Sequence, residues 1–472
     1  MADELWRKGA GDLARMIARK EVSSREVVRA HLDRVDRVNP SLNAIVRRFD
    51  EQALAEADRA DGAVRDGLPL GPLHGVPFTV KENIDLAGTP TTNAIAALAE
   101  ATAHRDAPVV ERMRAAGAIP IGRTNLPDMG LRVHTHSTLH GLTRNPWNPD
   151  VTAGGSSGGE AAALASGMSP IGLGNDIGGS LRNPAHCCGV ASIKPSAGLV
   201  PWATDVPPTA KALAAQTMLA EGVMARRVSD VRLGFDVVRG AHPRDPFSVN
   251  AILGDVQPGR PLRVALMIDV PGGRTDAGIA GVVAAAGQCL ASLGHRVEEA
   301  APPEFEAAVD MWGALLDADL VAMQPLLDAI LGPDALTFLS LGRQTFAPAE
   351  AGDAVALHTR RHELAARWSA WFAEWDVLVG PTWALPAFRH GFDVAGPGEV
   401  LEVFERIRPV LPANLFGAPA AVVPAGLADG LPVGVQVSAW RFSDHACLSV
   451  AQAIDERMGV ATPIDPVTAS GR

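Results

Sequence analysis

Apolar residues recur at helical spacing in several parts of the chain. Within residues 23–40 they fall on one face of a predicted helix, at Val28, Leu32, Val35 and Val38. Ser23 lies three residues before Glu26, which is the spacing of a capping box at a helix start, and Pro40 marks the predicted end. The same periodicity predicts further helices at about 50–66, 108–117 and 226–239.

A longer amphipathic pattern over residues 275–294 predicts a helix with Thr275 as N-cap and Gly294 as C-cap, followed by a short strand in HRVEE. Short apolar runs predict buried strands: GVPFTV, GAIPIG, SPIGLG, RVALM, DVLVG, AAVVPAG and VGVQVS. Because helices alternate with these runs, the pattern predicts an α/β fold layered around one large sheet. Residues from about 300 to 370 are expected to be mostly helical and to form the variable wall of a substrate site.

The overall charge and the cysteine content limit the classes of function. The net charge is −11 and the arginines are scattered, so the sequence gives no indication of nucleic-acid binding. No run of about 18 apolar residues predicts a membrane span, and the charged N-terminal stretch predicts a helix and no signal peptide. The four cysteines are too few and too irregularly spaced for a disulfide framework, so we expect a cytoplasmic protein.

Lys81 is unusual in a chain whose 42 basic residues comprise 5 lysines and 37 arginines. It directly follows the apolar run GVPFTV. Arginine does not release its proton in a protein, whereas a buried lysine can, because burial disfavours the charged form. Lys81 is therefore a candidate general base, and the alternative is a surface lysine whose stem lies along apolar side chains.

Glycine and serine are concentrated in residues 152–201, in one cluster around Ser156 and another that ends at Ser180. Glycine allows close backbone approach, so consecutive N–H groups can converge on an anion or a developing oxyanion. Tight turns or helix caps would use the same residue types. The G-x-S-x-G pattern around Ser156 lacks the preceding strand of a nucleophile elbow, and no phosphate-binding glycine motif is present.

Three histidines, His134, His136 and His140, form an alternative candidate site. His134 and His136 would share one face of a strand and could bind the metal ion of a metal-dependent amidohydrolase. No acidic residue lies at ligand spacing beside them, and a polar or pocket-lining role suits them better. A serine nucleophile has no histidine partner identifiable by spacing here, whereas Lys81 offers a Ser-Lys arrangement.

Several motifs together resemble the amidase signature family of Ser-cisSer-Lys hydrolases. The resemblance is carried by LHGVPFTVKENIDLAGTPTTNA, TAGGSSGGEAAALASG and GNDIGGSLRNPAHCCGVASIKPSAGLVP, which supply the lysine and both serine clusters. It extends over essentially the whole chain and is weakest between about 240 and 370. Two residues depart from the usual pattern: Asn175 stands where threonine or serine is commoner, and Glu82 where aspartate is usual.

The resemblance implies a role for each matching residue. It makes Ser180 the nucleophile, Ser156 the bridging serine after a cis peptide bond to Gly155, and Lys81 the base. The backbone N–H groups of an oxyanion hole would come from Ile177, Gly178, Gly179 and Ser180. The supporting residues would be Ser157, Asp176 and Arg182. Residues of the substrate pocket would be Met129, Trp383 and Asn414.

The resemblance also implies the fold and the reaction. The expected fold is one α/β domain over residues 1–472, with a mixed twisted sheet covered by helices on both faces. Within it we expect a helical segment at about 1–65, the catalytic motifs at about 70–200 and a variable region at about 240–370. The expected reaction is hydrolysis of a small or medium-sized aryl or aliphatic carboxamide, with esters and carbamates as further candidates.

The alternative within the same family is the glutaminase component of a tRNA-dependent amidotransferase. That component holds glutamine with a tyrosine and charged residues, and this chain has no tyrosine. For the amidase we expect no cofactor and no metal, a small-molecule amide as the binding partner, no nucleic acid or membrane partner, and a monomer or homodimer.

Overall fold

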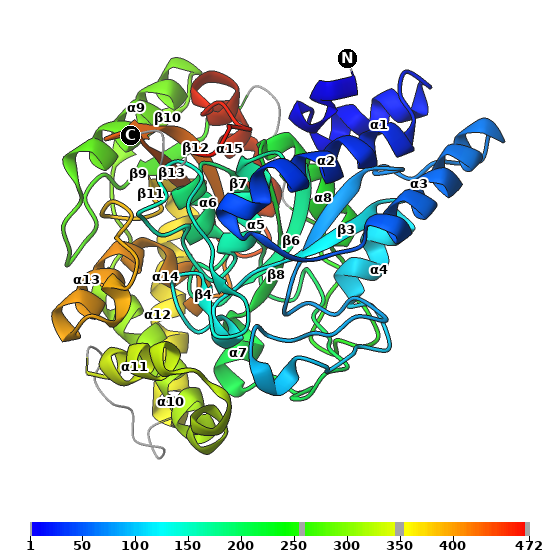
Figure 1. The fold of residues 1–472 in the computed structure, drawn as a ribbon. Helices are drawn as coiled ribbons and strands as arrows, with labels where there is room; N and C mark the ends of the chain where they lie inside the picture. Colours follow the sequence, from blue (N-terminus) through cyan, green and yellow to red (C-terminus); the bar gives the residue numbers. More distant parts are fainter. Residues whose placement is uncertain (1, 254–259, 345–353, 468–472) are drawn as a thin grey trace.

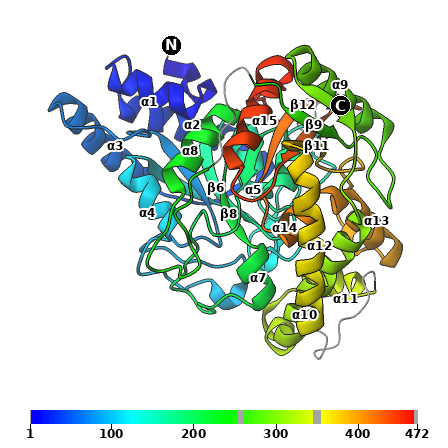
Figure 2. The same cartoon turned by 180° about the vertical axis from the view of Figure 1, so that it is seen from behind.

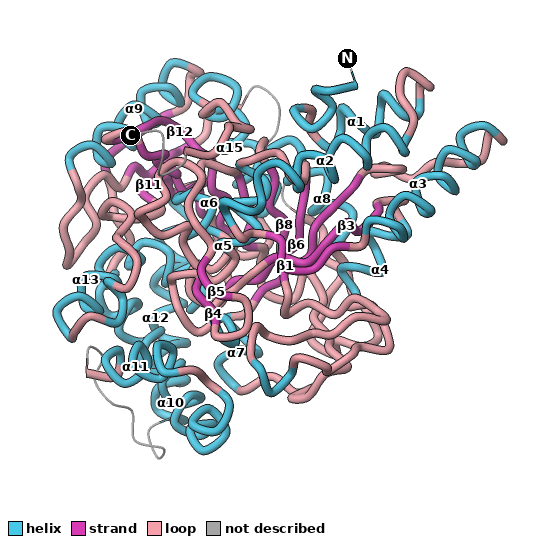
Figure 3. The backbone as a smooth tube through the Cα atoms, in the orientation of Figure 1, coloured by secondary structure: helices cyan, strands magenta, loops and turns pink. Residues whose placement is uncertain are grey.

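The computed structural model describes residues 2–253, 260–344 and 354–467. A mixed sheet of 11 strands crosses its centre in the order β1-β3-β2-β6-β8-β7-β12-β13-β11-β9-β10 (Figures 1 and 3). These strands are β1 (Ile45–Arg48), β2 (Pro77–Lys81), β3 (Ile119–Thr124), β6 (Ile171–Asp176), β7 (Ala191–Lys194), β8 (Ala220–Ala225), β9 (Arg263–Leu266), β10 (Arg296–Glu299), β11 (Val377–Pro381), β12 (Ala420–Ala428) and β13 (Leu431–Ser438). A separate hairpin pairs β4 (His136–Ser137) with β5 (Gly141–Leu142).

The sheet contains both parallel and antiparallel neighbours. β2 runs parallel to β3 and to β6, whereas β6 pairs with β8 in antiparallel register. Each of the predicted apolar runs and the predicted strand in HRVEE lies on one of these strands. The pattern missed β1, β7 and β8, because their short segments carry charged residues within the strand, such as Glu221 in β8.

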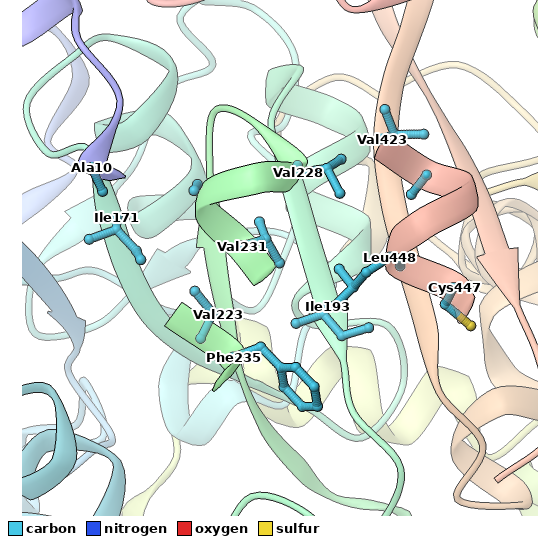
Figure 4. Close-up of a cluster of buried hydrophobic side chains, with 14 of the residues drawn as sticks. Ala10, Ile171, Ile193, Val223, Val228, Val231, Phe235, Val423, Cys447 and Leu448 are labelled. Carbon is cyan, nitrogen blue, oxygen red and sulfur yellow. The ribbon is translucent and has the colours of Figure 1, made fainter. Parts of the chain in front are cut away.

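Helices cover both faces of the sheet, as expected for the fold class. One face is covered by α1 (Ala10–Ala18), α4 (Pro108–Ala115), α8 (Val228–Val238), α9 (Ala277–Ser292) and α15 (Asp444–Met458). In Figure 4, Leu448 of α15 lies beside Ile193 of the sheet, and Val231 and Phe235 of α8 belong to the same buried cluster. The other face is covered by α5 (Gly158–Ala165), α6 (Arg182–Cys188) and α14 (Leu411–Leu415).

The two longest amino-terminal helices are α2 (Ser24–Leu42) and α3 (Asp50–Arg65). α2 begins with the predicted capping box, in which the Ser23 side chain accepts from the Glu26 N–H and Glu26 reaches back to the Ser23 N–H. Its end was predicted too early. Pro40 lies inside the last turn, and the chain leaves the helix at Asn43, which has a left-handed φ of 53°.

The start of α9 corrects another prediction. Asp276 is the N-cap, because its carboxylate accepts from the N–H groups of Gly278 and Ile279 at 2.9 and 3.3 Å. The Thr275 hydroxyl instead accepts from the Val270 N–H at 3.1 Å and so holds the preceding loop. Gly294 follows the helix end with φ of 89°, the conformation in which a glycine terminates a helix readily.

A helical lobe lies beside the sheet, at the lower edge of Figure 1 and again in the reversed view of Figure 2. It comprises α7 (Leu213–Met218), α10 (Phe305–Ile330), α11 (Pro333–Gly342), α12 (Ala354–Glu374) and α13 (Pro397–Ile407). Short 3-10 helices are η1 (Ala2–Arg7), η2 (Ala96–Leu98), η3 (Asp128–Gly130), η5 (Phe392–Val394) and η6 (Arg408–Val410). The prediction of mostly helical structure at about 300–370 is thus confirmed for the described residues. None of the helices described is both long and apolar enough to cross a membrane.

Candidate active site

The candidate site lies at one edge of the sheet, where two parallel strands end. Lys81 is the last residue of β2, and Asp176 is the last residue of its neighbour β6. Carboxyl ends of neighbouring parallel strands lie on the same edge of a sheet, so the loop after β6 passes close to Lys81. This loop, residues 177–180, leads into α6 and carries Ser180.

Ser156 reaches the same edge from the loop that precedes α5. The peptide bond between Gly155 and Ser156 is cis, as the resemblance implies. The Lys81 Nζ lies 2.8 Å from the Ser156 Oγ and 2.7 Å from the Asn175 Oδ1. The lysine and one serine of the predicted triad are therefore in direct contact, and Ser156 and Ser180 both line one cavity.

Lys81 is fully buried, and this burial controls its protonation. Loss of solvation lowers the pKa of Lys81 from 10.5 to about 7, against the opposing influence of the Glu221, Asp176 and Glu160 carboxyl groups. An amine with this pKa is largely neutral just above pH 7 and can accept a proton. Lys81 is therefore no surface lysine.

The two serine-bearing loops are joined by backbone and side-chain hydrogen bonds. The Ser157 N–H donates to the Ser180 carbonyl oxygen at 3.2 Å. The Asn183 side chain donates to the carbonyl oxygens of Gly155 and Gly178 at 3.3 and 3.1 Å, so one amide bridges both loops. Trp383 donates its indole N–H to the Asn183 Oδ1 at 2.9 Å and thereby fixes that amide.

Asp176 fixes the loop that carries Ser180. Its carboxylate accepts from the backbone N–H groups of Gly179 and Leu181 and from the Arg182 guanidinium, at distances of 2.8 to 3.2 Å. Burial would raise the pKa of Asp176, but the Arg182 charge outweighs that effect and holds the pKa well below its usual value. Asn414 completes this cluster, since it donates to Asp176 at 2.9 Å and accepts from Arg182 at 2.6 Å.

The same bonds decide which N–H groups are open toward the cavity. The Gly179 N–H donates to Asp176, so its assignment to the oxyanion hole is wrong for this structure. Gly179 has φ of 92°, a conformation that favours glycine, and therefore shapes the turn. Among the described residues, no acceptor bonds to the N–H groups of Ile177, Gly178 or Ser180. These three N–H groups are the available donors at the Ser180 loop, and their residues line the cavity.

The cavity beside the two serines has a volume of about 320 Å³. Its lining near the serines includes Met129, Asn83 and Asn175. Farther along, α10, α11 and α13 contribute apolar side chains: Trp312, Leu316, Leu320, Met323, Phe338, Leu339, Phe404 and Ile407. Trp312 also contacts the Ser180 loop, because its indole N–H donates to the Ile177 carbonyl oxygen at 2.8 Å.

The structure corrects the predicted positions of three residues. Trp383 and Asn414 were predicted in the substrate pocket, but both are fully buried outside the cavity lining, where they hold Asn183 and Asp176. Ser157 was predicted to support Lys81. Its buried hydroxyl has no hydrogen-bond partner in the described part of the chain, and Asn175 supports Lys81 instead. Met129 lines the cavity as predicted.

The histidines do not form a common site. His134 is buried and bonded to the Thr152 hydroxyl at 2.9 Å, whereas His136 faces Asp334 at 3.3 Å. Only His136 belongs to β4, so the two do not share a strand face. Among the residues that the structure describes, no three His, Cys, Asp or Glu side chains are grouped as a metal site would require. His140 lies apart from both, with its Nε2 3.9 Å from the Glu82 carboxylate, which is also paired with Arg123 at 3.2 Å.

Several residues of the site escaped the sequence analysis. Trp312 and Glu221 carry no motif of their own and reach the site from α10 and β8 through long-range packing. Asn183 lies within the motif that carries Ser180, but nothing in the sequence shows that its amide bridges both serine loops. The one available signal was Asn175, because an unusual residue beside the triad indicates an altered set of contacts.

The chain is similar in sequence and structure to known proteins. The family model Amidase matches residues 26–448. The chain is 39% identical to an indoleacetamide hydrolase of Bradyrhizobium diazoefficiens, over 97% of this chain and 87% of that protein. It is 31% identical to a component of the glutamyl-tRNA(Gln) amidotransferase of Salinispora tropica, over 96% and 98% of the two chains. A solved bacterial aryl acylamidase is similar in structure, with a TM-score of 0.83 and 29% identity over 95% of this chain and 96% of that chain.

A substitution at Trp383 can show whether this residue holds the Asn183 amide or contacts the substrate. In Trp383→Phe the ring remains but the Asn183 Oδ1 loses its donor, and a buried unpaired group costs about 1–3 kcal/mol. We expect kcat to fall about tenfold, by a similar factor for every substrate. The measurement is kcat and KM on a panel of amides. Phe338→Leu, which alters the cavity wall, is the control expected to change the order of the substrates. A changed order in Trp383→Phe would place Trp383 in the pocket after all.

Proposed function

Because the chain belongs to the amidase (amidase signature) family, we propose that Ser180, Ser156 and Lys81 are the nucleophile, bridging serine and base of its amide hydrolysis. Membership in this family confirms the predicted family, fold class and enzyme class, a serine-type amide hydrolase. The assignment of the individual residues depends on one observation. The fully buried Lys81 amine lies 2.8 Å from the Ser156 hydroxyl, on the loop bonded to that of Ser180.

The proposed reaction begins with neutral Lys81. Lys81 takes the proton of the Ser156 hydroxyl while Ser156 takes that of Ser180, and the Ser180 Oγ attacks the amide carbonyl carbon. The resulting oxyanion accepts from N–H groups of Ile177, Gly178 and Ser180, each of which contributes about 3–4 kcal/mol in comparable sites. Lys81 returns its proton through Ser156 to the leaving nitrogen, and the C–N bond breaks. Water then attacks the acyl-enzyme by the same proton route and releases the acid.

The substrate in this proposal is a small or medium-sized aryl or aliphatic carboxamide with an apolar substituent. Support comes from the apolar side chains of α10, α11 and α13, and from the activities that two relatives are named for, indoleacetamide hydrolase and aryl acylamidase. Esters and carbamates present the same carbonyl to Ser180, so they are further candidates. The steps above use side chains of the chain itself and require no cofactor or metal.

Glutaminase activity is the second candidate, because the amidotransferase component of Salinispora tropica matches nearly the whole chain. Free glutamine carries a carboxylate and an ammonium group, each of which needs a charged partner in the cavity. The cavity-lining cations are Arg132, Arg343 and Lys211. Arg132 is paired with Asp393 at 2.9 Å, Arg343 with Asp317 at 2.9 Å, and Lys211 with Asp245 at 3.8 Å. These pairings favour an uncharged substrate.

The proposal extends to location and assembly. We infer a cytoplasmic enzyme, supported by four free cysteine thiols, of which Cys187, Cys188 and Cys447 are buried. We infer a monomer or homodimer without nucleic-acid or membrane partners. A single chain supplies both serines, Lys81 and the cavity wall, so the chemistry has no need of a second chain.

Removal of either end of the proton route should abolish turnover. We expect Lys81→Ala and Ser180→Ala each to lower kcat by at least about a thousandfold, with little change in melting temperature. Lys8→Ala, at an exposed lysine, is the matched control and should retain full activity.

A fluorophosphonate should label Ser180 in the wild type, and chelators should leave the rate unchanged. Wild-type rates in Lys81→Ala would refute the route, and chelator-sensitive activity would favour metal chemistry.

The protonation of Lys81 sets the pH dependence of the reaction. Because the base must be neutral and its pKa is lowered to about 7, kcat/KM should be constant above that pH. Below it, kcat/KM should fall about tenfold per pH unit as Lys81 gains a proton. The measurement is kcat/KM between about pH 5 and 9 with a non-ionising amide. A half-point near the usual lysine pKa would contradict a buried neutral amine.

Substrate choice separates the two candidate functions. With an arylacetamide and glutamine offered as alternatives, we expect kcat/KM to favour the arylacetamide by at least about a hundredfold, because unpaired charges of glutamine would be desolvated. The measurement is ammonia release from each substrate. Preference for glutamine would establish the glutaminase hypothesis.

A further inference from the structure

Three carboxyl groups approach the Lys81 amine from different elements. Glu160 on α5 accepts from the Thr79 and Thr124 hydroxyls, and Asp176 on β6 is paired with Arg182. Glu221 on β8 differs from both. Its side chain is buried, and its Oε2 has no hydrogen-bond partner among the described residues. A buried unpaired oxygen destabilises the folded state, so Glu221 is not explained by a contribution to stability.

Asn175 connects Glu221 with Lys81. The antiparallel register of β6 and β8 places Asn175 directly opposite Glu221, so both side chains lie on the same face of the sheet. As a hydrogen-bond donor, the Asn175 side chain also lowers the pKa of Glu221 against the effect of burial. The Asn175 Oδ1 accepts from Lys81 at 2.7 Å, while its Nδ2 donates to the Asn83 Oδ1 at 3.0 Å. The carbonyl end of this amide therefore faces the amine, and its N–H end faces acceptor oxygens.

The orientation of this amide matters because of the geometry of a neutral amine. Neutral Lys81 has two N–H groups and one lone pair, and the lone pair must receive the proton of Ser156. When Asn175 accepts one N–H, rotation of the amine is restricted and the lone pair is directed toward the Ser156 Oγ at 2.8 Å. A reversed amide would present N–H groups to Lys81 and remove this constraint.

We propose that Glu221 is a positioning residue for Lys81, acting through Asn175. It accepts from the Asn175 amide and so keeps the Asn175 carbonyl oxygen directed at the Lys81 amine. The inference rests on the proposed function of Lys81. It also accounts for the asparagine at 175: a hydroxyl at this position could rotate to serve as donor or acceptor, whereas an amide needs an acceptor at its N–H end.

The charge of Glu221 is compatible with this role. Burial raises the pKa of Glu221 from 4.5 to about 8, although Lys81 and Lys211 favour its ionised form, and Asp85 opposes it. The carboxyl group is thus largely neutral at pH 7 and acts there as a hydrogen-bond acceptor. Glutamine, which is neutral and has the same shape, should therefore replace it.

The test is a double-mutant cycle between Glu221 and Asn175. At pH 7 we expect Glu221→Leu and Asn175→Leu each to lower kcat about tenfold with little change in KM, and Glu221→Gln to retain kcat within about twofold. The double variant Glu221→Leu/Asn175→Leu should be no slower than Asn175→Leu alone, because Glu221 acts through Asn175. The melting temperature of Glu221→Leu should be equal to or above that of the wild type.

The outcomes separate this inference from the proposed function. The rate of Ser180 labelling by a fluorophosphonate should follow kcat in all these variants. If Lys81→Ala abolishes labelling but Glu221→Leu leaves it unchanged, Asn83 orients Asn175 without Glu221 and the inference is overturned. Multiplicative losses in the double variant, or a lowered melting temperature with equal loss in Glu221→Gln, would indicate a structural role and also overturn it. Normal labelling in Lys81→Ala would instead overturn the proposed function.

Discussion

The reaction that we propose for this site depends on the burial of a single amine, that of Lys81. In water an ammonium group with a pKa near 10.5 would hold its proton, and no serine could pass a proton to it. The fully buried position at the end of β2 lowers that pKa to about 7. Burial therefore strongly disfavours the charged form of this amine. The rest of the fold has to offset the free energy that burial of this amine costs. The end of β2 and the side chains packed around Lys81 therefore have little freedom to change.

The loops around the serines are held by polar groups that lie outside the cavity lining. Asp176, Arg182 and Asn414 form a closed cluster beneath the Ser180 loop, and Trp383 fixes the Asn183 amide that bridges both loops. Because each of these groups is buried, any rearrangement that left one of them without a hydrogen bond would destabilise the protein. The cluster is therefore held in one arrangement. The loops therefore hold their N–H groups in place before a substrate arrives, which is what electrostatic stabilisation of an oxyanion requires.

Most strands and the serine motifs could be predicted from the sequence, but the side-chain contacts around them could not. Apolar runs identified the strands that carry Lys81 and Asp176, and the glycine-serine motifs identified Ser156 and Ser180, because local pattern determines those elements. Contacts such as Trp383 with Asn183, 200 residues apart, depend on how elements meet in three dimensions. The sequence therefore assigned Trp383 and Asn414 to the substrate pocket, whereas in the structure they support the loops. The Gly179 N–H was misassigned for the same reason, since only coordinates show which acceptor it uses.

In the proposed reaction, chemistry and substrate recognition come from different parts of the fold, and Trp312 belongs to both. The sheet edge supplies Lys81 and the serine loops, whereas α10, α11 and α13 supply the apolar wall. Trp312 lines the cavity, bonds to the Ile177 carbonyl oxygen and covers Gly178, where an added Cβ would lie 2.6 Å from its ring. Most wall residues can therefore change with substrate while the proton route stays intact. A change at Trp312 would alter the pocket and release the loop that holds the oxyanion donors, so specificity and rate are coupled at this position.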